Sequence, residues 1–188
     1  NAGNWSVPFS DSIILDTTPP VINIVSPPNL TNDNTPLLSY TMSEGTIYSV
    51  RMVDMGGSPY YWPWLLSQRS GDSFPTLPDG QHTLRIDAYD DAGNYAFVQK
   101  IFTVDTVAPA MTFNPVTTPT SLDSQTITGT RESSIPITVT VNTSAVPGLV
   151  TFPTATTWNC IITGLSDGDN IITVTAADAA NNQKSVTS

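Results

Sequence analysis

The sequence predicts an all-β protein built from two tandem β-sandwich domains, preceded by a strand that belongs to an earlier repeat. The first observation is internal duplication: residues 77–94 return as residues 165–182, shifted by 165 − 77 = 88, with seven identical positions and no gap. A period of this length marks a repeated domain. The second observation is alternation of apolar and polar residues, as in residues 137–143 and 171–177, which is typical of strands. The third is the spread of 16 prolines along a chain that sustains no helical period.

A second repeated landmark sets the domain boundaries. Residues 16–20, Asp-Thr-Thr-Pro-Pro, recur as residues 105–109, Asp-Thr-Val-Ala-Pro, at a shift of 105 − 16 = 89. Residues 1–17 are therefore expected to be the terminal strand of a preceding repeat and its linker. Domain 1 then covers residues 18–105, and domain 2 covers residues 106–188 with its last strand truncated.

The strands of domain 1 are expected where alternating residues are bounded by proline, glycine and turn residues. They are residues 21–25, 36–42, 47–53, 74–77, a strand that follows Gly80, and 95–104. Three apolar positions of the strand after Gly80 are expected to face the core: Leu84, Ile86 and Ala88. The positions that alternate with them are expected to face outward, away from the core: Thr83, Arg85 and Asp87.

Domain 2 repeats this plan. Its expected strands are residues 111–113, 126–130, 137–141, 149–152, 158–162 and 171–177, followed by a shortened last strand. In the turn before that last strand, Asn181 takes the place of Gly93. Glycine and asparagine both tolerate a positive φ, so the turn is expected to keep the same backbone while its side chain changes.

Charge and hydropathy exclude several classes of function. The chain has six basic and sixteen acidic residues and a net charge of −10, which repels phosphate backbones and anionic lipid surfaces. Nucleic acid is therefore not an expected partner. No apolar run approaches the roughly 20 residues that a membrane-spanning helix needs, and no signal peptide is present in this segment. The excess of carboxylates is compatible with divalent cations.

The two side chains that most often carry catalysis are expected to be structural here. Cys160 is the sole cysteine, and it shares one strand face with Trp158 and Ile162, which indicates a buried apolar role. His82 is the sole histidine, and its position just after an Asp-Gly turn suggests a corner residue that bonds back to that turn. The chain carries no Gly-x-Ser-x-Gly, His-Glu-x-x-His or phosphate-loop motif. The sequence thus favours a protein that is not an enzyme.

Three motifs give the chain a family resemblance. They are Asp-Thr-x-x-Pro at the start of each domain, Leu-x-Asp-Gly before the strand after Gly80 and its repeat, and Asp-x-Ala-Gly-Asn or its variant in the following turn. In these motifs the chain resembles, over essentially its whole length, the bacterial immunoglobulin-like (Ig-like) repeats of cell-surface proteins and adhesins. The resemblance implies tandem Ig-like β-sandwiches outside the cytoplasm, extracellular or on the cell surface, acting as a stalk, spacer or adhesive unit. The implied partners are neighbouring repeats and a host or surface glycan or protein.

Calcium at the domain junctions is a hypothesis that the resemblance also supports, since some adhesins of this type have calcium-stiffened junctions. The sandwich topology is expected to gather Asp16, Asp90 and Asp91 at the first junction. The corresponding set at the second junction is Asp79, Asp105 and Asp178. Ala179 replaces Asp91 in the second copy, which weakens that site. The alternative is that these residues only cap turns through hydrogen bonds to their own backbone.

One aromatic cluster suggests a different function. Tyr60, Tyr61, Trp62 and Trp64 lie in an irregular stretch, and aromatic rings on a loop can stack on sugar faces. This favours, as the alternative to a stalk, a carbohydrate-binding accessory module of a secreted glycan-active enzyme. The competing interpretation is that the rings cover the sandwich core or pack on a neighbouring domain.

The N-terminal segment carries a separate prediction. Residues 2–5 resemble residues 92–95, which lead from a turn into the last strand of domain 1. Residues 5–15 are therefore expected to be a strand without its domain. Because an unpaired strand tends to add to an open sheet edge, we expect it to pair with an edge in this chain or in a neighbour.

Overall fold

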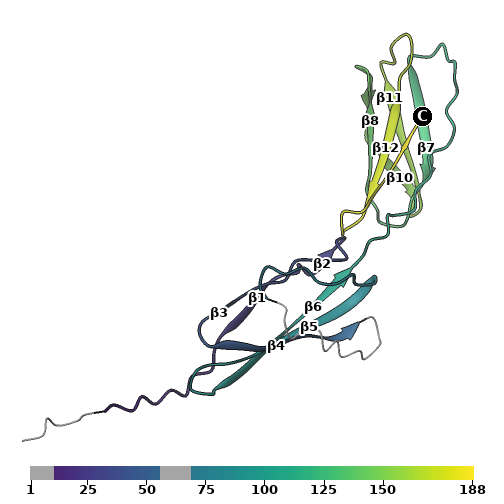
Figure 1. The fold of residues 1–188 in the computed structure, drawn as a ribbon. Coiled ribbons are helices and arrows are strands. Elements are labelled where there is room, and N and C mark those ends of the chain that lie inside the picture. Colours follow the sequence, from purple (N-terminus) through teal and green to yellow (C-terminus); the bar gives the residue numbers. More distant parts are fainter. Residues whose placement is uncertain (1–10, 56–68) are drawn as a thin grey trace, which may run out of the picture.

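The computed structural model describes residues 11–55 and 69–188, and these residues form thirteen β-strands and no helix (Figure 1). The strands before residue 105 are β1 Ile22–Ser26, β2 Leu30–Thr31, β3 Ser39–Met42, β4 Thr46–Met55, β5 Gly80–Tyr89 and β6 Tyr95–Val104. Those after it are β7 Ser124–Thr130, β8 Ile137–Val141, β9 Val146–Pro147, β10 Thr151–Thr154, β11 Thr157–Thr163, β12 Ile172–Ala177 and β13 Gln183–Thr187. The all-β prediction is confirmed. Among the described residues, no helix is long and apolar enough to cross a membrane.

The strands before residue 105 form two sheets. One contains β1 and β3, and the other has the order β2-β6-β5-β4. Strands β5 and β6 make a regular antiparallel hairpin whose register runs from the Gly80–Val104 pair to the Tyr89–Tyr95 pair. Strand β2 adds to the far side of β6 in parallel.

The strands after residue 105 form two further sheets. Their orders are β10-β11-β7, with β9 also on β11, and β13-β12-β8. The hairpin of β12 and β13 repeats that of β5 and β6, and β8 pairs with β12 as β4 pairs with β5. Figure 1 shows the two sets of strands one after the other along the molecule. Both sets are consistent with an Ig-like β-sandwich.

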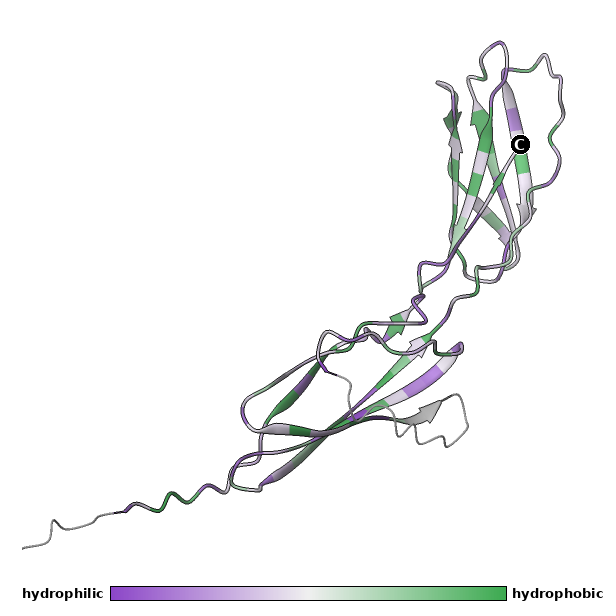
Figure 2. Ribbon diagram, viewed as in Figure 1, coloured by the Kyte–Doolittle hydropathy of each residue, from purple (hydrophilic) through white to green (hydrophobic). Residues whose placement is uncertain are grey.

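Two separate hydrophobic clusters lie between the sheets. The first core consists of Leu38, Val50, Met52, Phe74, Leu77, Leu84, Ile86, Phe102 and Val104. The second core consists of Met111, Ile127, Ile137, Val139, Ala145, Trp158, Cys160, Ile162, Ile172, Val174 and Ala176. The period-two alternation of each strand places its apolar residues on the inner face, and Figure 2 shows hydrophobic residues interleaved with polar ones along the strands. The expected burial of Leu84, Ile86 and Ala88, and of Trp158, Cys160 and Ile162, is confirmed.

Some expected strands are shorter or absent. Residues 74–77 form no strand, although Phe74 and Leu77 donate backbone hydrogen bonds to Pro36 and Asn34. Residues 111–113 also form no strand, although Met111 makes an isolated bridge with Arg131 and the N–H of Thr112 donates to the carbonyl of Thr130. Proline limits regular pairing in such segments because it has no N–H to donate. The remaining expected strands are present, with bounds shifted by a few residues.

The N-terminal segment is extended and exposed where the structure describes it. Residues 11–15 form no strand, and Ile13 is 99% exposed and Leu15 86% exposed. Pairing of residues 11–15 with an edge of this chain, as predicted from the sequence, is therefore wrong. Residues 5–10 lie outside the described residues, and pairing with a neighbouring chain stays a prediction.

Candidate functional site

The turn between β5 and β6 is organised by Asp90 and Asn94. The Asp90 side chain accepts hydrogen bonds from the backbone N–H of Asn94 at 2.8 Å and from its Nδ2 at 2.9 Å. Gly93 provides the positive φ of 90° that the turn needs. Burial raises the pKa of Asp90, but the hydrogen bonds from Asn94 and the turn backbone outweigh it and hold the pKa below the usual value. Asp90 is therefore an ionised, well-partnered carboxylate.

The same asparagine reaches the linker that precedes the first core. Nδ2 of Asn94 donates to the backbone carbonyl of Asp16 at 3.1 Å. Asp16 in turn accepts the N–H of Thr18 at Oδ1 at 3.0 Å, which fixes the bend of the Asp-Thr-x-x-Pro segment. One side chain thus joins the turn of a hairpin to the chain that enters the sandwich.

This arrangement recurs at the linker between the two cores. Asp178 accepts from the backbone N–H of Asn182 at 2.8 Å and from its Nδ2 at 2.9 Å. Nδ2 of Asn182 also donates to the carbonyl of Asp105 at 2.7 Å. Oδ1 of Asp105 accepts the N–H of Val107 at 3.1 Å. We call each such bond from the turn asparagine to the linker carbonyl a linker clasp.

The linker between the cores is also held from the first core. Oδ1 of Asp79, in the turn before β5, accepts both the N–H of Thr106 at 3.1 Å and its hydroxyl at 2.9 Å. The N–H of Asp105 donates to the carbonyl of Thr31 at 2.9 Å. Residues 105 and 106 are therefore hydrogen-bonded on both sides: Thr106 to Asp79 in the turn before β5, and Asp105 to Asn182 in the turn after β12.

The structure brings only some of the predicted calcium ligands together. Among the described residues, one group of three carboxylates lies with its ligand atoms within 4.8 Å of one another: Asp16, Glu44 and Asp90. Two of these were predicted, Glu44 was missed, and Asp91 is not in the group. The sequence signal for Glu44 is its repetition as Glu132 at a shift of 132 − 44 = 88, which marks a repeated position but does not indicate its approach to Asp16 and Asp90.

The second predicted set does not converge. Asp79, Asp105 and Asp178 all lie at the linker between the cores, but each carboxylate accepts the hydrogen bonds described above, and the three form no such group. The equivalent of Glu44 is also occupied, because Oε2 of Glu132 accepts the N–H of Ala110 at 3.2 Å. At this linker, the alternative interpretation of turn and linker capping describes the observed contacts.

The corner before the repeated hairpins is held by two different side chains. Nε2 of His82 hydrogen-bonds the carbonyl of Pro78 at 2.8 Å, and His82 is fully buried. At the equivalent place, Nδ2 of Asn170 donates to the carbonyl of Ser166 at 2.8 Å. The structural role predicted for His82 is confirmed.

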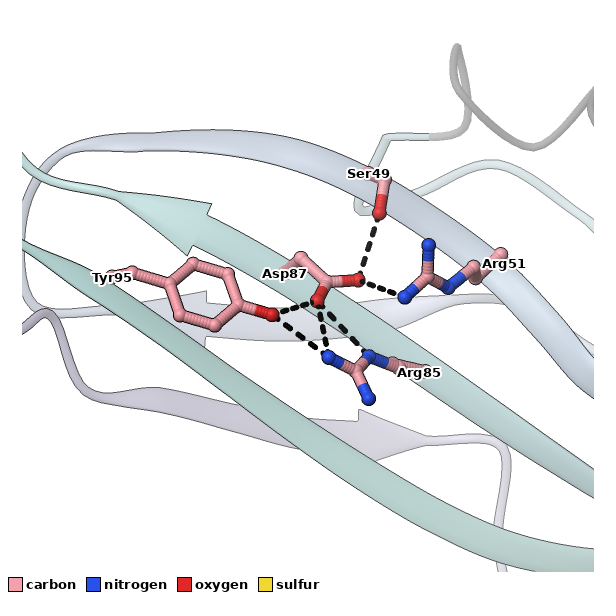
Figure 3. Close-up of polar contacts among 5 residues, drawn as sticks. All are labelled: Ser49, Arg51, Arg85, Asp87 and Tyr95. Atoms are coloured by element: carbon pink, nitrogen blue, oxygen red, sulfur yellow. Dashed lines mark hydrogen bonds and ion pairs between the residues drawn. The ribbon is translucent and has the colours of Figure 1, made fainter.

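A buried carboxylate on the outer face of the first sheet was not predicted. Asp87 was expected to face outward, and it lies on the outer face, but it is only 3% exposed. Figure 3 shows the polar side chains that surround it. It accepts hydrogen bonds from Ser49 at 2.8 Å, from Nε and Nη2 of Arg85 at 3.0 and 2.8 Å, and from the Tyr95 hydroxyl, and it pairs with Arg51 at 3.3 Å. Burial raises the pKa of Asp87, but these partners, Arg85 foremost, lower it below the usual value. The predicted face is correct, and the burial was not predicted because it comes from long neighbouring side chains that cover this position.

The aromatic cluster at residues 60–64 and a cleft in the second set of strands are the two remaining candidate places. Tyr60, Tyr61, Trp62 and Trp64 lie outside the described residues, so the predicted glycan platform stays a prediction. A cleft of about 610 Å³ lies between residues 116–125 and residues 165–172. Asp167, the equivalent of Asp79, is among its lining residues.

Comparison with known proteins identifies the first core. Residues 24–106 match the family model of the bacterial Ig-like domain, which confirms the family predicted for this part of the chain. No curated protein matches the chain. Among solved structures it is similar to "Bacteroides ovatus mixed-linkage glucan utilization locus (MLGUL) SGBP-B in complex with mixed-linkage heptasaccharide", at 14% identity and a TM-score of 0.30, covering 88% of this chain and 45% of that chain. The chain thus spans less than half the length of that structure, and a likeness at this level carries no functional argument.

Proposed function

We propose that this chain, whose residues 24–106 are a bacterial Ig-like domain, is a non-enzymatic spacer of a bacterial extracellular or cell-surface protein. Bacterial Ig-like domains are usually found in such proteins. In this proposal each hydrophobic core belongs to one domain, with boundaries near residues 18–105 and 106–188, and the neighbouring repeats are the main partners. The single observation that carries the proposal is that residues 105 and 106 are hydrogen-bonded both to Asp79 and to Asn182.

The mechanism is restriction of bending. A free linker between two domains samples many backbone conformations, and each ordered residue costs conformational entropy. The hydrogen bonds that Thr106 donates to Asp79 and that Asn182 donates to the carbonyl of Asp105 offset this cost, at about 0.5–1.5 kcal/mol for each hydrogen bond. A spacer built in this way transmits position along the chain because its joint resists reorientation.

The test removes both side chains that hold residues 105 and 106, Asp79 and Asn182. In the variant Asp79→Ala with Asn182→Ala, small-angle X-ray scattering should show a wider range of end-to-end distances than in the unaltered chain. The matched control is Asp167→Ala, at the position equivalent to Asp79 but away from the linker, and it should leave the scattering unchanged. Melting curves check that both cores remain folded. Identical scattering from the folded double variant and the unaltered chain would refute the proposal.

We further propose calcium as a ligand of the first linker, because Asp16, Glu44 and Asp90 converge there. Three carboxylates this close repel one another, and a divalent cation with oxygen ligands relieves the repulsion. Isothermal titration with calcium chloride should show binding that Glu44→Gln weakens strongly. The matched variant is Glu132→Gln, because the Glu132 carboxylate accepts a backbone hydrogen bond from Ala110. This variant should bind calcium as the unaltered chain does. Absence of heat, together with a melting temperature that calcium leaves unchanged, counts against the site.

The carbohydrate-binding alternative rests on the aromatic cluster of residues 60–64. It predicts that Tyr61→Ala and Trp62→Ala abolish glycan binding while the melting temperature stays the same. Loss of stability in these variants would instead indicate that the rings pack against the protein.

A further inference from the structure

The outer face of the first large sheet carries a row of exposed aromatic rings. Tyr48, Tyr89, Tyr95 and Phe97 are 66%, 41%, 41% and 52% exposed, and together we call them the aromatic face. Their ring centroids lie 5.6 Å apart for Tyr48 and Tyr89, 5.1 Å for Tyr89 and Tyr95, and 6.2 Å for Tyr95 and Phe97. The register pairs Tyr89 with Tyr95, which places these rings side by side on adjacent strands. The rings therefore form one continuous surface.

Hydrogen-bond donors border this surface. The guanidinium carbon of Arg85 lies 3.9 Å from the centre of the Phe97 ring. Asp87 fixes Arg85 through Nε and Nη2, and the described contacts leave its Nη1 donors for a ligand. The side chains of Arg51 and Arg85 are 35% and 21% exposed, so both reach solvent beside the rings. Asp87 thus holds two cations in fixed positions at the edge of an apolar surface (Figure 3).

The fold itself does not require these residues, as the second set of strands shows. The positions equivalent to Tyr89, Tyr95 and Phe97 are Ala177, Gln183 and Ser185, each at a shift of 88. Those equivalent to Arg85 and Asp87 are Thr173 and Thr175. There the same face is a set of hydroxyl contacts, such as Thr175 to Ser185 at 2.8 Å.

Tyr48 lies in a β-bulge of β4 that has no counterpart in β8, the equivalent strand of the second set. The pairing of β4 with β5 shifts between Ile47 and Ser49, so Tyr48 is the extra residue of a bulge. Strand β8 pairs with β12 from Ile137 through Val141 without such a shift. Bulges are common beside functional sites, where they redirect a side chain. The bulge adds a fourth ring to the row, and its contact with Tyr89 is edge-on at 90°.

Charge decides the kind of occupant. On this face Asp87 pairs with two cations, Arg51 and Arg85, whereas the chain as a whole carries a net charge of −10. A second copy of the chain, also at −10, would be repelled, and phosphate-bearing partners are disfavoured for the same reason. A neutral sugar chain meets no such repulsion, and it offers C–H faces to the rings and hydroxyl groups to the arginines.

We propose that the aromatic face, with Arg51 and Arg85, binds a neutral polysaccharide. The rings stack on pyranose faces, and the arginines donate to sugar hydroxyl oxygens. This site does not depend on the linker clasps, and it consists of described residues other than the cluster at residues 60–64. Binding involves no covalent change.

Affinity electrophoresis tests the proposal with hydroxyethyl cellulose, xylan and galactomannan as neutral probes and alginate as the anionic one. The unaltered chain should be retarded by at least one neutral polymer and not by alginate. The double variant Tyr89→Ala with Phe97→Ser, which installs the residues of the second sheet, should bind at least about tenfold more weakly. Its melting temperature should change little, because both side chains are exposed.

The matched control is Phe152→Ser. Phe152 is 44% exposed and has the guanidinium carbon of Arg131 3.8 Å from its ring centre, so it reproduces the Arg85–Phe97 pair elsewhere on the chain. This variant should bind as the unaltered chain does. No retardation by any of the three neutral polymers overturns the proposal, as does retardation by alginate alone. Two further results would overturn the proposal. If the chain self-associates and the double variant abolishes this, the aromatic face binds a second copy of the chain. If polysaccharide binding is lost in the variant Tyr61→Ala with Trp62→Ala but not in the double variant, the loop that carries Tyr61 and Trp62 binds the polysaccharide.

Discussion

Asp87 illustrates at the scale of a single residue what alternation does and does not determine. The period-two pattern of β5 correctly separates Leu84 and Ile86 from Asp87, which lies on the opposite face. It does not determine whether that face is covered. Coverage depends on the reach of side chains from two neighbouring strands, Arg51 on β4 and Tyr95 on β6, and their register cannot be derived from the strand that carries Asp87.

Replacing Asp87 with asparagine should lower the free energy of unfolding at pH 7 by about 1–3 kcal/mol, because several charge-assisted hydrogen bonds are lost. The folded pKa of Asp87 lies below its unfolded value of about 3.9. The carboxylate therefore stabilises the fold above that unfolded value, and this contribution disappears as the pH falls through the folded pKa. Urea unfolding at a series of pH values should show the gap between Asp87→Asn and the unaltered chain narrowing below about pH 4. A gap that stays constant with pH would contradict the assignment.

The repeated hairpin shows at the scale of an element how far a duplication can be used. The sequence predicts both hairpins, their inward residues and the equivalence of Gly93 with Asn181. The structure confirms the last point, with φ of 90° at Gly93 and 68° at Asn181. It also shows what the hairpin comparison leaves out: Glu44 lies outside the repeated block, so its approach to Asp16 and Asp90 depends on how separate elements pack.

Gly93 and Asn181 give a direct exchange experiment. Gly93→Asn should cost under about 1 kcal/mol, because asparagine tolerates a positive φ and a Cβ at Gly93 would have no neighbour within 4 Å. Gly93→Val should cost about 1–3 kcal/mol, because a β-branched residue is strained in this region while the available space is the same. Chemical unfolding of both variants measures the difference. If both variants lose the same stability, the turn does not select its residue by tolerance of a positive φ.

At the scale of the whole molecule, the period predicts the linker positions but not their contacts. The shift of 89 between Asp16 and Asp105 and of 88 between Asn94 and Asn182 places each asparagine beside its linker. At both linkers the structure shows a hydrogen bond from the turn asparagine to the linker carbonyl, whereas carboxylates converge only at the first linker, where Glu44 joins Asp16 and Asp90. A carbonyl is present at every residue, so no side-chain pattern could have indicated which one is used.

The separation of the two hydrophobic cores predicts independent unfolding. Leu84 is fully buried in the first core and Ile162 in the second, so each truncation to alanine should destabilise its own core by about 2–5 kcal/mol. In differential scanning calorimetry, Leu84→Ala should lower the temperature of one transition and Ile162→Ala that of the other. The polar contacts at residues 105 and 106 are few compared with those in either core. The free energy that couples the two transitions should therefore be smaller than the stability lost in either truncation. If both variants instead shift one shared transition, the chain unfolds as a single cooperative unit and the division near residue 105 fails.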